Sequence, residues 1–175
     1  MTRVLRSVVL GLAGLGLVAL LRSTQPDRAP LPSPTLAPAA PAPSALAHVD
    51  GTDGLRLEVL ALTQVSAAVL EVRFALSNQL PTQPIGIGAR FSERPEEAGT
   101  VSAALLISEE RAAKHFVLRN SDGTPACSDN LLQLAAGERR EVWARFVTPG
   151  APGARVTFHL PQLPPVRGLS LPAGT

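Results

Sequence analysis

The sequence predicts an all-β domain built from two packed antiparallel sheets, and three observations support this fold class. From Leu55 onward, apolar residues recur at every second position, the period of a strand with one buried face. About eight such short segments follow one another, separated by clusters of Pro, Gly, Asn and Asp that favour turns. One apolar face per strand predicts a sandwich of two sheets or a small barrel, and residues 48–175 are long enough to enclose a core.

Each predicted strand alternates inward apolar residues with outward polar or small ones. The inward positions are Leu55, Leu57, Val59 and Ala61; Leu70, Val72, Phe74 and Leu76; Ile85, Ile87, Ala89 and Phe91; Val101, Ala103, Leu105 and Ile107; Phe116 and Leu118; Val142, Ala144 and Phe146; Val156, Phe158 and Leu160; and Leu169 and Leu171. Asp122-Gly123 suits a tight turn, because glycine takes positive φ without a steric penalty. Residues 108–114 are predicted as one helical turn, with Ser108 as its N-cap.

A hydrophobic segment precedes this domain. Arg3 and Arg6 come before an unbroken apolar run at residues 8–21, the pattern of a secretory signal. As a helix, this run would span roughly 21 Å of a hydrocarbon core that is ~30 Å thick, which favours a cleaved signal peptide. No small-x-small cleavage site follows Leu21 closely, which favours an uncleaved anchor. We predict a signal anchor over residues 1–21, held in the inner (cytoplasmic) membrane by residues 8–21; the alternatives are a cleaved signal peptide with secretion, and a cytosolic protein. The anchor and the cleaved signal both place the domain outside the cytoplasm, in the periplasm or at the cell surface.

The next segment predicts a disordered linker. Residues 22–47 contain seven Pro and seven Ala and no Gly. Such a composition cannot bury enough apolar surface to fold, and frequent Pro favours the extended polyproline II conformation. At ~3.1 Å per residue, the linker could hold a domain roughly 80 Å from the membrane. It is interpreted either as a stalk that crosses an envelope layer or as a tether whose length matters little.

Composition excludes several classes of function. The single Cys rules out an internal disulfide framework and a Cys-rich zinc site. Residues 48–175 carry 12 basic and 13 acidic residues, so the domain has no basic excess with which to bind nucleic acid. No Gly-x-Ser-x-Gly elbow, Walker loop or dinucleotide fingerprint occurs, and we expect no cofactor.

Cys127 and a group of glutamates are the candidates for catalysis. A free thiol in an exported protein can be inert, can form an intermolecular disulfide or can act as a nucleophile, for which His115 is the nearest base in the sequence. Glu93, Glu96 and Glu97 share one loop, and paired carboxylates can serve as general acid and base only in a pocket that shifts their pKa values. We expect an inert thiol and solvated glutamates.

Histidine and aspartate residues are the candidates for a metal site. His48, Asp50 and Asp53 lie just before the first predicted strand, where carboxylates spaced by Gly could bind a hard cation. Such a cation needs six or more oxygen ligands, so we interpret this segment as a polar turn. His115 and His159 lack a third ligand and do not predict a zinc site.

Trp143 is the candidate for an interaction surface. If Val142, Ala144 and Phe146 point inward, Trp143 faces outward beside Arg145. An exposed Trp–Arg pair is typical of an interaction hot spot. The alternatives are the opposite register and a Trp143 buried beneath a neighbouring loop.

Several segments together resemble a known family. They are LLIS (105–108), HFVLRNSDGTPACS (115–128), AGE (136–138), VWARF (142–146) and VTFHLP (156–161). Over roughly residues 55–172 the chain resembles bacterial exported immunoglobulin-like β-sandwich domains of unknown function, the immunoprotective-extracellular type found in lipoproteins and envelope proteins. This resemblance implies an immunoglobulin-like fold and no catalytic residues. The chain lacks a second Cys near Cys127, so no paired-Cys feature of relatives is carried over.

These observations together predict a non-enzymatic module tethered in the envelope, which binds another protein or an envelope component through its loops and sheet edges. One alternative is an exported hydrolase with a site built from loops, and another is a purely structural spacer. An enzyme requires a concave pocket with converging polar groups and a perturbed acid or base. A binding module requires a convex or flat surface with an apolar patch around Trp143, or an open strand edge.

Overall fold

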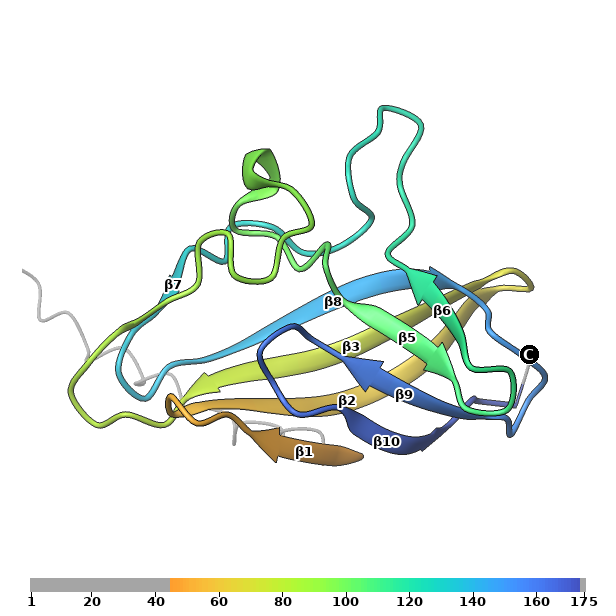
Figure 1. Cartoon of the computed structure of the whole chain (residues 1–175), viewed down its shortest axis with the longest axis horizontal. Helices are drawn as coiled ribbons and strands as arrows, with labels where there is room; N and C mark the ends of the chain where they lie inside the picture. The colour runs from red at the N-terminus through yellow and green to blue at the C-terminus, as the bar shows by residue number, and fades with distance from the viewer. Residues whose placement is uncertain (1–44, 174–175) are drawn as a thin grey trace, which may run out of the picture. The chain divides into compact units, whose positions relative to one another are not determined.

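The computed structural model describes residues 45–173, whose regular structure is β-strand apart from a single 3-10 turn at Pro95–Glu97 (Figure 1). The strands are β1 (Ala47–Asp50), β2 (Leu55–Ser66), β3 (Val69–Asn78), β4 (Ile85–Gly86), β5 (Leu105–Ser108), β6 (Ala113–Phe116), β7 (Gln133–Leu134), β8 (Arg139–Val147), β9 (Arg155–His159) and β10 (Val166–Ser170). They form two four-stranded sheets, ordered β1-β2-β3-β8 and β10-β9-β5-β6, and a two-stranded sheet β4-β7. All pairings are antiparallel, which confirms the predicted all-β class and is consistent with a β-sandwich.

The predicted N-terminal helix and most of the linker lie outside the described residues. Strand β1 begins at Ala47, the last residue of the predicted linker. Within residues 45–173, no helix is long and apolar enough to cross a membrane.

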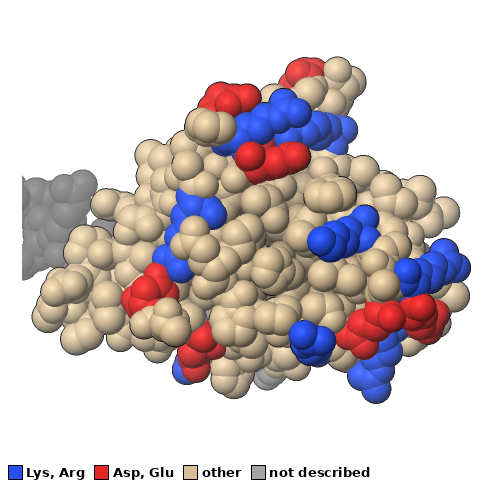
Figure 2. Space-filling view, viewed as in Figure 1, with Lys and Arg blue, Asp and Glu red and all other residues tan. Residues whose placement is uncertain are grey.

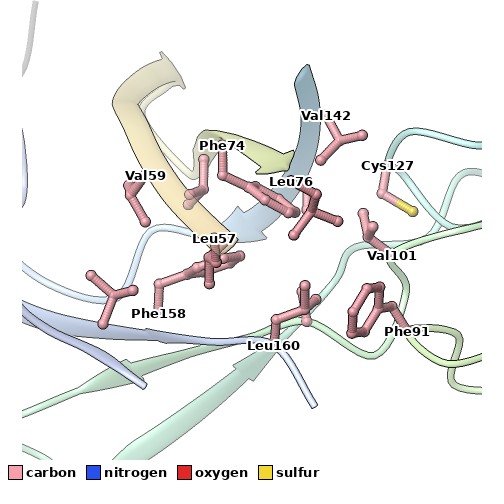
Figure 3. Packing of buried hydrophobic residues seen from close by; sticks show 14 of the residues in the cluster. Leu57, Val59, Phe74, Leu76, Phe91, Val101, Cys127, Val142, Phe158 and Leu160 are labelled. Carbon is pink, nitrogen blue, oxygen red and sulfur yellow. The ribbon is translucent and has the colours of Figure 1, made fainter. Parts of the chain in front are cut away.

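The core lies between the two large sheets. The inward residues predicted for β3, β8 and β9 are all buried, at 4% exposure or less, as the period of two predicts. Phe74 of β3 and Phe146 of β8 both contact Phe158 of β9, with ring centroids 4.9 and 6.3 Å away. These aromatic contacts join the two sheets, and Figure 3 shows Phe74 and Phe158 within the surrounding cluster of apolar side chains.

The predicted orientation of β5 is wrong. Leu106 is fully buried, whereas Leu105 and Ile107 are only partly buried and lie on the outer face. The alternation does not run unbroken from Val101 into β5, because a turn lies between them. This turn is closed by the Ala104 N–H, which donates a hydrogen bond to the Val101 carbonyl. This turn buries Val101 and Ala104 and changes which face the following residues occupy.

The predicted orientation of β6 and the predicted helical turn before it are also wrong. Phe116 pairs with Leu105, so it shares the outer face and is 60% exposed. Ser108 ends β5, and Ala113 begins β6, so residues 108–114 belong to a β-hairpin. Four residue pairs between β5 and β6 outweigh the local capping signal of Ser108.

Two further strand predictions need correction. The strand expected over residues 85–91 is limited to β4, because Gly88 adopts a φ of +47° and the chain turns there, leaving Ala89 exposed. In β2, a bulge after Val59 leaves Ala61 partly exposed and directs Leu62 into the core instead.

Candidate functional site

Two loops come together beside the edge strand β8. The β4–β5 loop covers residues 87–104, and the β6–β7 loop covers residues 117–132. They are joined by backbone hydrogen bonds of 2.8 Å from the Ile87 N–H to the Leu132 carbonyl and from the Leu131 N–H to the Gly99 carbonyl. In Figure 1 both loops rise above the sheets, and Figure 2 shows charged side chains gathered over the same region.

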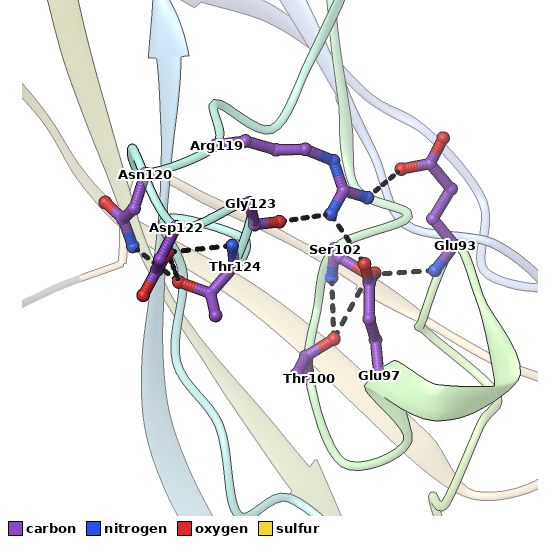
Figure 4. Close-up of polar contacts among 9 residues, drawn as sticks. All are labelled: Glu93, Glu97, Thr100, Ser102, Arg119, Asn120, Asp122, Gly123 and Thr124. Atoms are coloured by element: carbon purple, nitrogen blue, oxygen red, sulfur yellow. Dashed lines mark hydrogen bonds and ion pairs between the residues drawn. The ribbon is translucent and has the colours of Figure 1, made fainter.

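A charged cluster ties the two loops together. Arg119 of the β6–β7 loop donates hydrogen bonds to Glu93 at 2.7 Å and to Glu97 at 2.6 Å, both in the β4–β5 loop (Figure 4). The Ser102 hydroxyl donates to the other oxygen of Glu97 at 2.6 Å. These four residues form the Arg119 cluster, which fixes two loops that have no regular secondary structure in common.

Glu97 carries the buried charge of this cluster, with only 9% of its surface exposed. Burial raises the pKa of the Glu97 carboxyl, but the hydrogen bonds from Arg119 and Ser102 outweigh burial and leave the pKa below its ordinary value. A carboxyl held ionised in this way suits charge pairing better than general-acid catalysis.

A pocket of about 470 Å³ lies between the loops and β8. The side chains that matter for its chemistry are Glu96, Glu97, Asp129, Asn120, Cys127 and Trp143. The structure thus brings together three candidates that the sequence presented separately: the glutamates, the thiol and the tryptophan. The remaining loop glutamate, Glu93, pairs with Arg119 and does not line the pocket.

Trp143 forms one wall of the pocket and lies beside Arg145. The Arg145 guanidinium stacks on the indole at 4.9 Å from the ring centroid and donates a 3.0 Å hydrogen bond to the nearly buried Glu71. Ser128 holds the backbone of Trp143 with two 2.9 Å hydrogen bonds, one from its N–H and one to its hydroxyl. On β8, Val142 and Ala144 face the core as predicted. The side chain of Trp143 points to the other face of the strand and is half-buried beside the β6–β7 loop.

Cys127 lines the pocket in an environment that disfavours the thiolate. Its side chain is 8% exposed, beside Val101 and Val142 in Figure 3. Burial raises the pKa of the Cys127 thiol, and the negative charges of Glu97 and Asp129 raise it further. No histidine lines this pocket in the described part of the chain, and His115 lies on β6, paired with the core residue Leu106. The structure therefore does not assemble a Cys–His pair.

The acidic turn before β2 is neutralised by arginine. Asp50 accepts a 2.6 Å hydrogen bond from Arg56, and Asp53 pairs with Arg90. These contacts lower the pKa of both carboxyls. Among residues 45–173 there is no group of three or more His, Cys, Asp or Glu side chains placed to hold a metal ion.

An apolar surface that the sequence pattern did not predict lies on the outer face of β5 and β6. Leu105, Ile107 and Phe116 lie there because of the register described above. Figure 2 shows that the centre of this view is largely uncharged. The turn at residues 101–104 sets this orientation, and its sequence contains no Gly, Pro, Asn or Asp that would mark it as a turn.

Comparison of the chain with protein-family models, curated proteins and solved structures gives no match. The class of protein is therefore defined by its own geometry. It is an antiparallel all-β domain with a preformed pocket, walled by an aromatic side chain, beside one strand edge.

Proposed function

We propose that this protein is a non-enzymatic module, tethered in the envelope, that binds another protein or an envelope component through the pocket at Trp143. The observation that carries the proposal is the pocket itself, a concavity of about 470 Å³ held by backbone and charge contacts with Trp143 as a wall. A concave pocket with converging polar groups is also the feature expected of an enzyme, so the state of its ionisable groups is used to choose between binding and catalysis.

The state of the ionisable groups supports binding over catalysis. Nucleophilic catalysis by Cys127 would need a thiolate or a nearby base, whereas burial and acidic neighbours stabilise the neutral thiol. General-acid catalysis by Glu97 would need a raised pKa, and its pKa is lowered. Cys127 is therefore held as a neutral thiol and Glu97 as a paired carboxylate, and neither state favours the catalytic role considered for it.

The proposal includes an immunoglobulin-like sandwich of the bacterial exported type. Its support is that segments carrying the resemblance lie together across the edge of β8. The Leu118 N–H donates to the Arg145 carbonyl at 2.8 Å, and the Arg145 N–H donates to the Ala126 carbonyl at 3.0 Å. Segments 115–128 and 142–146 thus form one continuous hydrogen-bonded unit.

The tethering part of the proposal is based on the sequence of the N-terminal region. The hydrophobic run at residues 8–21 would anchor the chain in the membrane, and the Pro-rich residues 22–47 would hold the domain away from it. A tethered module of this kind can reach partners in the envelope without leaving the membrane.

Site-specific crosslinking in intact cells tests the proposal. A photoreactive amino acid at Thr124, an exposed residue lining the pocket, should give discrete adducts, and the same probe at the exposed Val65 should not. Trp143→Ala should reduce the Thr124 adducts at least about fivefold, because truncating an interface aromatic residue commonly costs more than ~1 kcal/mol. Equal adducts at both positions, or adducts that survive Trp143→Ala, would contradict the proposal.

A further inference from the structure

We infer that the Trp143 pocket receives a positively charged side chain, lysine or arginine, from a partner polypeptide. This inference rests on the proposed function and names the chemistry of the ligand. Three features of the pocket carry it: its unpaired carboxylates, the lack of a balancing cation among the described residues that line it, and its indole wall.

The first feature is where the unpaired carboxylates lie. Of the 13 acidic residues in the described domain, ten accept a hydrogen bond or pair with an arginine. The three described acidic residues that have neither are Glu96, Glu110 and Asp129. Two of these three, Glu96 and Asp129, line the same pocket. Elsewhere in the described domain, almost every acidic side chain has a hydrogen-bond donor or an arginine as its partner. The pocket is therefore where unpaired negative charge is concentrated.

The second feature is that, within residues 45–173, no lysine or arginine lines the pocket to balance this charge. The nearby Arg119 is already committed to Glu93, Glu97 and the Gly123 carbonyl. Arg94 also acts on Glu97, but it is exposed and does not line the pocket. A ligand that brings a positive charge would therefore complete the electrostatic balance of the site.

The third feature is the indole of Trp143. The Arg145 guanidinium already stacks on this ring, 4.9 Å from its centroid, so a ligand cation would contact the part of the indole that Arg145 leaves free. Carboxylates accept hydrogen bonds and cannot donate them, so the pocket is complementary to the donor-only groups of lysine and arginine.

The size of the pocket favours a polypeptide over a bare metal ion. A volume of about 470 Å³ exceeds the space that one ion needs, and no metal-ligating cluster occurs in residues 45–173. The volume can accept a long cationic side chain together with part of its backbone.

Fluorescence titration with a tetralysine peptide tests the inference on the full chain in detergent micelles. Trp143 is the only tryptophan, so a change in its emission reports directly on the pocket. The peptide should bind the wild-type chain more weakly as salt increases, and the fully N-acetylated peptide should not bind. The double variant Glu96→Gln with Asp129→Asn should weaken binding about tenfold, because it removes both unpaired carboxylates from the pocket.

Glu110→Gln is the matched control, because Glu110 is also exposed and unpaired but lies outside the pocket lining. It should leave tetralysine binding unchanged. The inference is overturned if the acetylated peptide binds equally well, if the double variant retains full affinity or if tetralysine does not bind. Adducts from Thr124 that persist in any of these cases would preserve the proposed function and exclude only the cationic ligand.

Unfolding of the double variant must be checked by thermal denaturation. The side chains of Glu96 and Asp129 are exposed and make no hydrogen bond with other residues of the described domain, so we expect an unchanged midpoint. Loss of tetralysine binding with a wild-type midpoint supports the inference. If the double variant loses binding and also unfolds, the single variants Glu96→Gln and Asp129→Asn are measured instead. Each single variant should reduce the affinity for tetralysine without changing the midpoint.

Discussion

At the scale of single residues, His115 is the least well satisfied polar side chain on the second sheet. Its register partner on β5 is Leu106, a core residue, so the imidazole lies on the inner side of the sheet. The Nε2 atom is buried and has no hydrogen-bond partner among residues 45–173. A buried polar atom that has lost its contacts with water costs roughly 1–3 kcal/mol.

Replacing His115 with an apolar residue should therefore stabilise the protein. We expect His115→Leu to raise the free energy of unfolding by about 1 kcal/mol, measured by urea denaturation at pH 7. His159→Leu is the control, because His159 lies on the opposite, outer face of the same sheet and should give a change within ±0.5 kcal/mol. A destabilised His115→Leu variant would show that the imidazole makes a contact that stabilises the fold.

At the scale of structural elements, the Arg119 cluster determines whether the two loops stay together. Glu97 is nearly buried, and removing its cationic partner leaves a charge that is neither paired nor fully hydrated. Arg119→Ala should lower the urea midpoint, and Glu97→Gln in the same chain should recover part of the loss. Arg140→Ala, which removes a half-exposed pair with Glu138, is the control and should have little effect.

The same cluster predicts a dependence of stability on pH. The folded-state pKa of Glu97 lies below its unfolded value of about 4.3, so the ionised carboxyl stabilises the protein above that pH and this contribution disappears as the pH falls through the folded pKa. In Arg119→Ala, burial of Glu97 acts with less opposition, so the acid loss of stability should begin at a higher pH. Unfolding midpoints between pH 3 and 7 check this, and parallel profiles for the two proteins would contradict it.

The length of an element decides how well its orientation could be predicted from sequence. Strands β3 and β8 have ten and nine residues, and their uninterrupted alternation identified the buried faces correctly. Strands β5 and β6 have four residues each, and a single turn before β5 reversed the predicted faces. Alternation with a period of two shows which residues share a face of the sheet, but the pairing register decides which face is buried. In short strands, that register is set by the partner strands and not by the strand's own sequence.

The pocket could be predicted only in part for a related reason. The outward direction of Trp143 follows from its place between Val142 and Ala144. The approach of Glu97 to Cys127 depends on two loops that share no periodic pattern and meet only through contacts distant in the sequence, such as Arg119–Glu97. Sequence therefore indicated the individual residues of the site but not that they share one pocket.

At the scale of the whole molecule, the distribution of charge separates the chain into two parts. Residues 1–47 carry four Arg and one Asp, a net charge of +3, whereas residues 48–175 carry 12 basic and 13 acidic residues, a net charge of −1. The basic excess thus lies around the apolar run at residues 8–21 and leaves the β-domain nearly neutral. We propose that these arginines serve membrane anchoring: Arg3 and Arg6 precede the apolar run and Arg22 and Arg28 follow it, so they flank both of its ends without setting its orientation strongly.

Retention of the N-terminal segment is the prediction that follows for the intact protein. We expect the membrane fraction of cells to contain the whole chain and mass spectrometry to recover peptides from residues 1–21, because no small-x-small site closely follows Leu21. Ser23→Ala together with Gln25→Ala and Pro26→Ala introduces that motif without a proline directly after the cleaved bond, and should convert most of the protein into a shorter, soluble form. A wild-type mature protein that begins near His48 would contradict the anchor, and an unprocessed triple variant would show that the motif alone does not decide cleavage.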